Sequence, residues 1–98
     1  MGRIVFIGDE LTATGLKLAG VEVTTPEPGR TASALAEAQR GAQLVLIGSD
    51  RARDVPPAVL EEALLSLDPV VAVVPDITGT VPLPDLARRL RSILGIES

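Results

Sequence analysis

The 98-residue chain is long enough for one small domain, and we expect residues 1–98 to share a single core. Its formal net charge of −4 disfavours nucleic acid as the main partner, because phosphate binding requires clustered Lys and Arg side chains. Cys and His are absent, which excludes a thiol nucleophile and the commonest metal ligands, so we expect no catalytic residue, metal or cofactor.

Strand-like and helix-like segments alternate along the chain. Short runs rich in Val and Ile predict strands over residues 3–7, 20–24, 43–47 and 70–74. A longer amphipathic segment follows each run, and these segments predict helices over residues 11–19, 31–40, 56–67 and 83–94. The order βαβαβαβα predicts an α/β fold built on a parallel sheet.

The hydrophobic patterns of the strands predict their order in the sheet. Leu44–Ile47 and Val70–Val74 are apolar on both faces, which is typical of parallel strands covered by helices. Val21–Thr24 alternates between apolar and polar residues, so we expect it at an edge. The sequence therefore predicts a small open four-stranded sheet of order 2-1-3-4, with helices on both faces, as in Rossmann-like and flavodoxin-like folds.

Proline and glycine mark the predicted boundaries. Pro26–Gly29 ends the second strand, and Gly41 ends the second helix. Pro56 or Pro57 suits the first turn of the third helix, and the Asp-Pro pair at 68–69 ends that helix before the fourth strand.

The turn Gly8-Asp9-Glu10 after the first strand has two interpretations. It lies where open α/β sheets usually bind ligands, and carboxylates in that place can hold a divalent cation. In the interpretation that we favour, Asp9 caps the first helix and Glu10 interacts with the positive end of its dipole.

A receiver-like signalling domain, or another small regulatory binding domain, is the main alternative from another functional class. A receiver also begins with a strand and an acidic pair, and Asp50 lies near the place of the phosphoacceptor. However, Asp50 follows Gly48-Ser49 instead of ending the strand directly, and Lys17, the only lysine, lies in the first predicted helix. The phosphoryl chemistry then lacks its stabilising cation, so we rank this alternative lower.

Three residues of the first predicted helix are candidate partner contacts. The hydroxyls of Thr12 and Thr14 could bond a ligand, although hydroxyls near a helix start more often bond local backbone. Gly15 lies inside the helix, where glycine costs about 0.5–1 kcal/mol relative to alanine. Its presence therefore indicates close approach by another part of the chain or by a partner.

The last predicted helix is amphipathic. Its apolar residues recur at helical spacing, and they are Leu83, Leu86, Ala87, Leu90, Ile93 and Leu94. Arg88, Arg89 and Arg91 lie largely on the other side. Two interpretations remain open: the apolar stripe packs on the parent sheet, or one edge of the helix docks on a coiled coil whose acidic side chains the arginines reach.

The segment from Ile4 to Val21 resembles the start of the F subunit of V-type and A-type rotary ATPases. In that family the first strand runs into a Gly-Asp turn and then a Thr-x-Thr-Gly-hydrophobic-basic-Leu-Ala-Gly segment, which residues 12–20 match nearly residue for residue. The resemblance is looser in the second half, where the strand over 70–74 ends in Val-Pro, as strands of the family often do.

The resemblance implies a noncatalytic rotor subunit of the central stalk. Such a protein docks on the coiled-coil D subunit inside the catalytic A/B ring, and helps couple ATP hydrolysis or synthesis to proton or sodium transport. The active sites would then belong to other subunits. The residues expected at the partner interface are Thr12, Thr14, Gly15, Arg88, Arg89, Leu90, Arg91 and Leu94.

The sequence predicts a cytoplasmic chain that is peripheral to the membrane through the ATPase complex. Its N-terminus enters a strand without the apolar region and cleavage site of a signal peptide. No apolar stretch approaches the roughly 20 residues that a membrane-spanning helix needs, so we expect no direct insertion.

Overall fold

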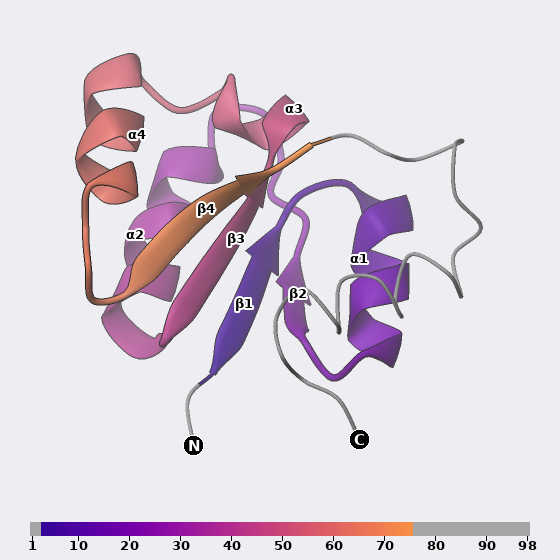
Figure 1. Cartoon of the computed structure of the whole chain (residues 1–98). Helices are drawn as coiled ribbons and strands as arrows, with labels where there is room; N and C mark the ends of the chain where they lie inside the picture. The colour runs from indigo at the N-terminus through magenta and orange to yellow at the C-terminus, as the bar shows by residue number, and fades with distance from the viewer. Residues whose placement is uncertain (1–2, 76–98) are drawn as a thin grey trace.

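The computed structural model describes residues 3–75, which form a parallel sheet with helices on both faces (Figure 1). The elements in chain order are β1 (Ile4–Ile7), α1 (Glu10–Leu18), β2 (Glu22–Thr24), α2 (Thr31–Gly41), β3 (Leu44–Gly48), α3 (Ser49–Ala52), α4 (Pro57–Leu64) and β4 (Val70–Val74). The strand order β2-β1-β3-β4 confirms the predicted order. The helix predicted over 83–94 lies outside the described residues.

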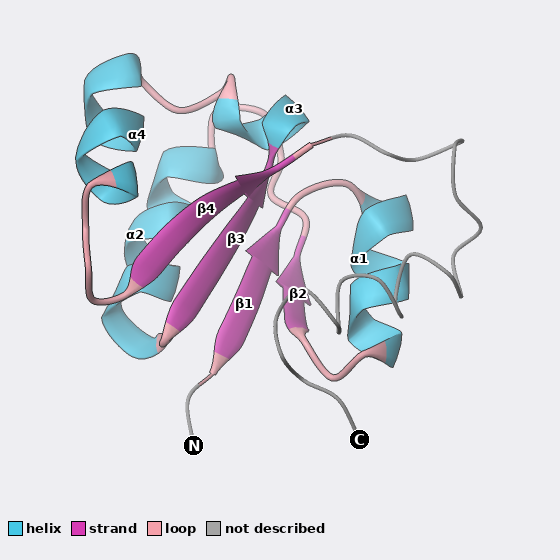
Figure 2. Cartoon of the chain, in the orientation of Figure 1, coloured by secondary structure: helices cyan, strands magenta, loops and turns pink. Residues whose placement is uncertain are grey.

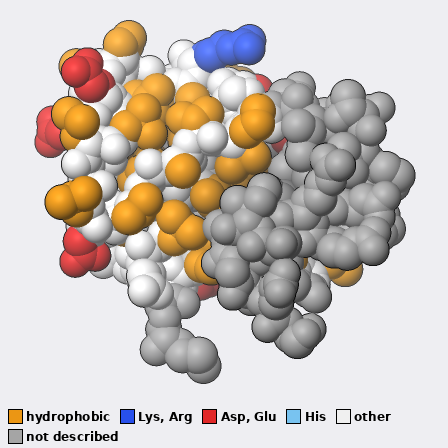
Figure 3. Space-filling model, in the orientation of Figure 1, with side chains coloured by type: hydrophobic (Ala, Val, Ile, Leu, Met, Phe, Trp, Pro, Cys, Tyr) orange, Lys and Arg blue, Asp and Glu red, His pale blue; other side chains and the backbone are white. Residues whose placement is uncertain are grey.

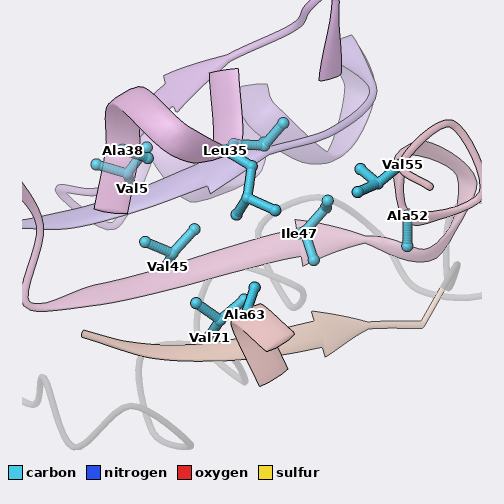
Figure 4. Close-up of a cluster of buried hydrophobic side chains, with 10 residues drawn as sticks. Val5, Leu35, Ala38, Val45, Ile47, Ala52, Val55, Ala63 and Val71 are labelled. Atoms are coloured by element: carbon cyan, nitrogen blue, oxygen red, sulfur yellow. The ribbon is translucent and has the colours of Figure 1, made fainter. Parts of the chain in front are cut away.

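The larger part of the core lies between the sheet and the helices α2, α3 and α4. Figure 4 shows aliphatic side chains of three neighbouring strands pointing toward side chains of these helices and of the segment after α3. The buried members of this cluster are Val5, Ile7, Leu35, Ala38, Val45, Ile47, Ala52, Val55, Ala63 and Val71. Because none of them is aromatic, the layer is filled by small branched side chains and alanines.

The second part of the core lies on the opposite face, where α1 lies against β1 and β2 (Figure 2). Phe6 and Leu16 are fully buried there. They pack with Ala13, Val21, Leu46 and Val74. The helices on both faces confirm the predicted doubly wound arrangement.

Local sequence explains where α1 begins and ends. The Asp9 carboxylate accepts a hydrogen bond from the Thr12 amide at 2.9 Å, which caps the first turn. At the other end, Gly20 has a φ of 89°, and its amide donates to the Lys17 carbonyl at 3.0 Å. The Val21 amide donates to the Leu16 carbonyl at 3.1 Å, which completes a Schellman motif and turns the chain into β2.

The region after β3 differs from the sequence prediction in two ways. The segment directly after β3 forms a short helix, α3, which the sequence pattern does not predict. The helix predicted over 56–67 begins at Pro57 and ends at Leu64. It ends early because Leu67 forms an antiparallel bridge with Val70 and leads the chain into the last strand.

The apolar pattern of β4 does not mean that both of its faces are covered. Because β4 lies at the edge opposite β2, its side chains meet neighbours on one side only. Val70 is 47% exposed and Val73 is 39% exposed. A strand in the middle and a strand at the edge of a parallel sheet therefore share the same sequence pattern here.

Candidate functional site

The carboxyl ends of the parallel strands meet at one edge, where ligands usually bind in this class of fold. Asp9 and Asp50 line that edge together with Gly48 and Thr12, but the space between them is only about 10 Å³. A cavity of that size holds at most one water molecule. The space between Asp9 and Asp50 is therefore too small for a nucleotide, whereas a separate space of about 190 Å³ beside Asp50 is lined by Pro28, Arg51 and Asp54.

Both carboxylates at this edge already have protein partners. Asp9 accepts the Thr12 amide as the cap of α1, which confirms the capping role predicted for it. Asp50 lies in the first turn of α3 and accepts a hydrogen bond from Arg51 Nη1 at 2.7 Å. Among residues 3–75, no group of three or more acidic side chains forms a candidate metal site.

Gly8 is required because the ring of Phe6 occupies the space beside it. A Cβ built at Gly8 would lie 2.6 Å from Phe6 Cε2, well inside van der Waals contact. Phe6 is fully buried in a packed cluster, so its ring can make room for a Cβ only by displacing neighbouring side chains. The Gly-Asp turn thus has a packing explanation for its glycine and a capping explanation for its aspartate.

The three candidate partner residues of α1 differ in their exposure to solvent. Thr14 is exposed, and its hydroxyl donates to the Glu10 carbonyl at 2.9 Å, which is the local backbone bond that its position favours. Thr12 and Gly15 are buried. The other candidates, Arg88, Arg89, Leu90, Arg91 and Leu94, lie outside the described residues.

Asp54 is a structural residue that no sequence pattern revealed. Its carboxylate accepts the Thr31 hydroxyl at 2.7 Å and the Gly29 amide at 2.8 Å, so it joins the α3–α4 connection to the start of α2. These hydrogen bonds, the one from Thr31 first, hold the pKa of Asp54 below its ordinary value. No local spacing signal joins residues 23–25 positions apart, so only the fold reveals this link.

Arg3 and Glu22 form a second link that the sequence did not predict. The two side chains make hydrogen bonds of 2.7 and 3.1 Å between the residue before β1 and the first residue of β2. The bonds raise the pKa of Arg3 and lower the pKa of Glu22. They lie in a groove of about 260 Å³ between β2 and α2.

The end of α4 presents leucines to solvent. Leu65 is 74% exposed and Leu67 is 90% exposed, because both follow the last residue of the helix. Their spacing predicted that they lie on an amphipathic helix, so the sequence did not reveal this apolar surface.

These observations define a class of protein: a small open α/β domain in which the two carboxylates at the strand ends have protein partners and two leucines after α4 are exposed. The chain belongs to the ATP synthase (F/14-kDa) subunit family, whose model matches residues 4–89. As a member of that family, it is one of the subunits of a V/A-type ATPase.

A solved structure has the same fold. The F subunit of the V-type ATP synthase from Archaeoglobus fulgidus superposes with a TM-score of 0.63 at 17% sequence identity. The match covers 74% of this chain and 96% of that one. The comparison with curated proteins returned no match. Within the described residues, no helix is long and apolar enough to cross a bilayer.

Proposed function

We propose that the chain is the noncatalytic central-stalk subunit of its ATPase, and that it docks on the coiled-coil D subunit. It turns with the stalk inside the catalytic A/B ring and helps couple ATP hydrolysis or synthesis to proton or sodium transport. The observation that carries the proposal is the family match over residues 4–89. The complex would hold the chain at the cytoplasmic side of the membrane.

A part that transmits torque has to be stiff, and the described residues provide such a body. Each strand pairs in parallel register with its neighbours, and a cluster of buried hydrophobic side chains packs on each face of the sheet. Close-packed interiors resist deformation. The link from Asp54 to Gly29 and Thr31 also fixes the connections at one end of the sheet.

The proposed interface combines α1 with the C-terminal segment. Thr14 is exposed on α1 and can contact the D subunit directly. Thr12 and Gly15 are buried, so they would meet the partner only if assembly uncovers them. In the C-terminal segment, the proposed contacts are Arg88, Arg89, Leu90, Arg91 and Leu94. Arginine side chains suit pairing with carboxylates of a coiled coil.

Binding of the purified D subunit from the same host tests the function. The two chains are mixed, the complex is captured through a tag on the D subunit, and its size is measured by light scattering. A stable heterodimer is the expected result. If both chains are folded and no complex forms, the rotor assignment is wrong, and phosphorylation of Asp50 by acetyl phosphate becomes the next assay.

Leu90→Asp and Leu94→Asp test the interface. Each is expected to weaken binding of the D subunit by about tenfold or more, or about 1.4 kcal/mol, because a carboxylate replaces an apolar contact. Leu67→Asp tests the exposed leucines after α4 as the alternative interface, since it makes the same change at a leucine that is 90% exposed. If Leu67→Asp weakens binding and the other two variants do not, the interface lies at the α4–β4 connection instead. Far-UV circular dichroism checks that each variant is folded.

A further inference from the structure

The end of α4 carries three exposed leucines on the side of the molecule away from α1. Leu64 is 41% exposed, and Leu65 and Leu67 are more exposed still. We call these three residues the leucine patch. The helix α4 packs beside β4 on one face of the sheet, whereas α1 packs beside β2 on the other. A partner that docks on α1 therefore leaves the leucine patch open.

The backbone holds the leucine patch in a defined position. The Leu65 amide donates to the Glu61 carbonyl at 3.1 Å, although Leu65 follows the last residue of the helix. The bridge from Leu67 to Val70 then holds Leu67 beside the first residue of β4. A partner would meet leucines whose backbone is already ordered, which lowers the entropic cost of binding.

Each exposed leucine of the patch has a carboxylate near it. Glu61 precedes Leu64 and Leu65 by three and four residues, so it lies on the same side of the helix. Asp68 directly follows Leu67. Both carboxylates are exposed, and neither forms an ion pair within the described part of the chain. Figure 3 shows hydrophobic and acidic side chains interspersed along the left margin, where Figure 1 places α4.

The negative charge of the described residues is concentrated in this region. Residues 57–75 contain three acidic residues, Glu61, Glu62 and Asp68, and no Lys or Arg. Residues 3–56 contain seven acidic and six basic residues, so they are nearly neutral. The surface around the leucine patch is therefore both apolar and acidic.

A groove between α2 and α4 lies next to the leucine patch. Its volume is about 450 Å³, and it is lined by Gln39, Val59, Glu62, Ala63 and Ser66. Ser66 stands between Leu65 and Leu67 in the sequence, so the groove reaches the patch. Grooves of this kind commonly receive the apolar side of an amphipathic helix.

We propose that the leucine patch and this groove bind a basic amphipathic helix of a protein other than the D subunit. The apolar side of that helix packs on the leucines, and its Lys and Arg side chains meet Glu61, Glu62 and Asp68. A second copy of this chain does not suit the surface, because it would bring the same carboxylates against those already there.

This binding goes beyond the proposed function, which places the D subunit on α1 and the C-terminal segment. Binding of the basic helix is measured on the full-length chain without the D subunit. Either proposal can therefore fail while the other holds.

A designed peptide tests the inference. It has about 18 residues, or five helical turns, with Leu on one side and Lys on the other. The peptide carries a dye, and fluorescence anisotropy measures its binding. Leu65→Ser combined with Leu67→Ser is expected to weaken binding about tenfold or more, because apolar contacts are lost. Glu61→Gln combined with Glu62→Gln is expected to weaken binding about threefold at low salt, and less at high salt.

Two matched variants serve as controls. Leu11→Ser changes an exposed leucine of α1, on the other face of the sheet. Glu27→Gln combined with Glu37→Gln removes the same charge from exposed side chains outside α4. Neither control is expected to change binding by more than about twofold, because exposed charges far from the peptide are screened. Circular dichroism checks that each variant is folded.

Four outcomes overturn the inference. The first is that the folded full-length chain does not bind the peptide, and the second is that a control variant weakens binding as much as its matched variant. The third is that a peptide with Glu in place of Lys binds equally well. The fourth is a dimer of the free chain, detected by light scattering, that Leu65→Ser with Leu67→Ser dissociates, because a second copy would then occupy the patch.

Binding of the D subunit separates the two surfaces. The combined variant Leu65→Ser and Leu67→Ser is expected to bind the D subunit as tightly as the unchanged chain. A loss of that binding in the folded variant would assign the leucine patch to the D subunit and contradict the inference.

Discussion

At the scale of single residues, Gly8 shows that packing selects the residue type in the turn after β1. The ring of Phe6 fills the space where any larger residue would place its Cβ. Phe6 is buried in the α1-side cluster and cannot turn away without opening a void there. The glycine that looks like part of a ligand-binding turn is thus explained by one aromatic ring.

Gly8→Ala is expected to destabilise the free chain by about 1–3 kcal/mol, because the added methyl group overpacks a filled core. Urea unfolding followed by far-UV circular dichroism measures the change. Gly41→Ala is the matched control, since its new Cβ meets only the end of the flexible Arg3 side chain. An unchanged midpoint for Gly8→Ala would mean that the Phe6 ring has room to move.

At the scale of elements, the strands and most helices follow from hydrophobic pattern and punctuation. All four predicted strands agree with β1 to β4 to within about two residues at each end. Pro57 begins α4, as its fixed φ predicts. The helix α2 ends at Gly41 as predicted, although Gly41 is the last helical residue and not a left-handed cap. Strand order follows because β2 alone alternates between apolar and polar residues.

The errors concern segments whose shape depends on distant contacts. The short helix α3 is too brief to show a helical period, so no pattern reveals it. Leu65 and Leu67 continue the apolar spacing of α4, yet the bridge from Leu67 to Val70 removes them from the helix. The hydrogen bonds of Asp54 to Thr31 and of Arg3 to Glu22 could not be predicted from the sequence either. They join segments that are far apart in the sequence and that only the fold brings together.

The N-terminal cap of α1 can be tested as an element. Asp9→Ala is expected to lower the free energy of unfolding by about 0.5–2 kcal/mol, because the Thr12 amide loses its acceptor. Asp9→Asn is the matched variant, since asparagine caps about as well as aspartate. Equal losses in both variants would instead indicate that the charge at this position matters more than the hydrogen bond.

At the scale of the whole molecule, acid stability depends on carboxylates that join distant segments. Asp54 and Glu22 both have a pKa below the ordinary value, through hydrogen bonds from Thr31 and Arg3 respectively. A lowered folded-state pKa gives stability that is present above the unfolded-state pKa and is lost as the pH falls through the folded-state value. For carboxylates this window lies at about pH 4 and below.

Asp54→Asn is expected to make unfolding less dependent on pH in that range and to lower the thermal midpoint at neutral pH. Thermal unfolding from about pH 7 to about pH 3 measures both effects, because this range spans the ordinary carboxylate pKa. Asp68→Asn is the control, because its exposed side chain makes no hydrogen bond within the described residues. If the two variants follow the same pH curve, Asp54 is not a source of the acid sensitivity.

The single aromatic ring of this chain also determines how the complete assembly can be observed. Phe6 is the only aromatic residue, and the chain contains neither Trp nor Tyr. In a complex with the D subunit, every tyrosine or tryptophan emission signal would therefore come from the partner. In a methyl NMR spectrum of the free chain, all ring-current shifts originate from Phe6, which packs with Leu16 and Val74. A change in these displaced methyl resonances would thus report a change in packing on the α1 side of the core when the protein binds a partner or unfolds.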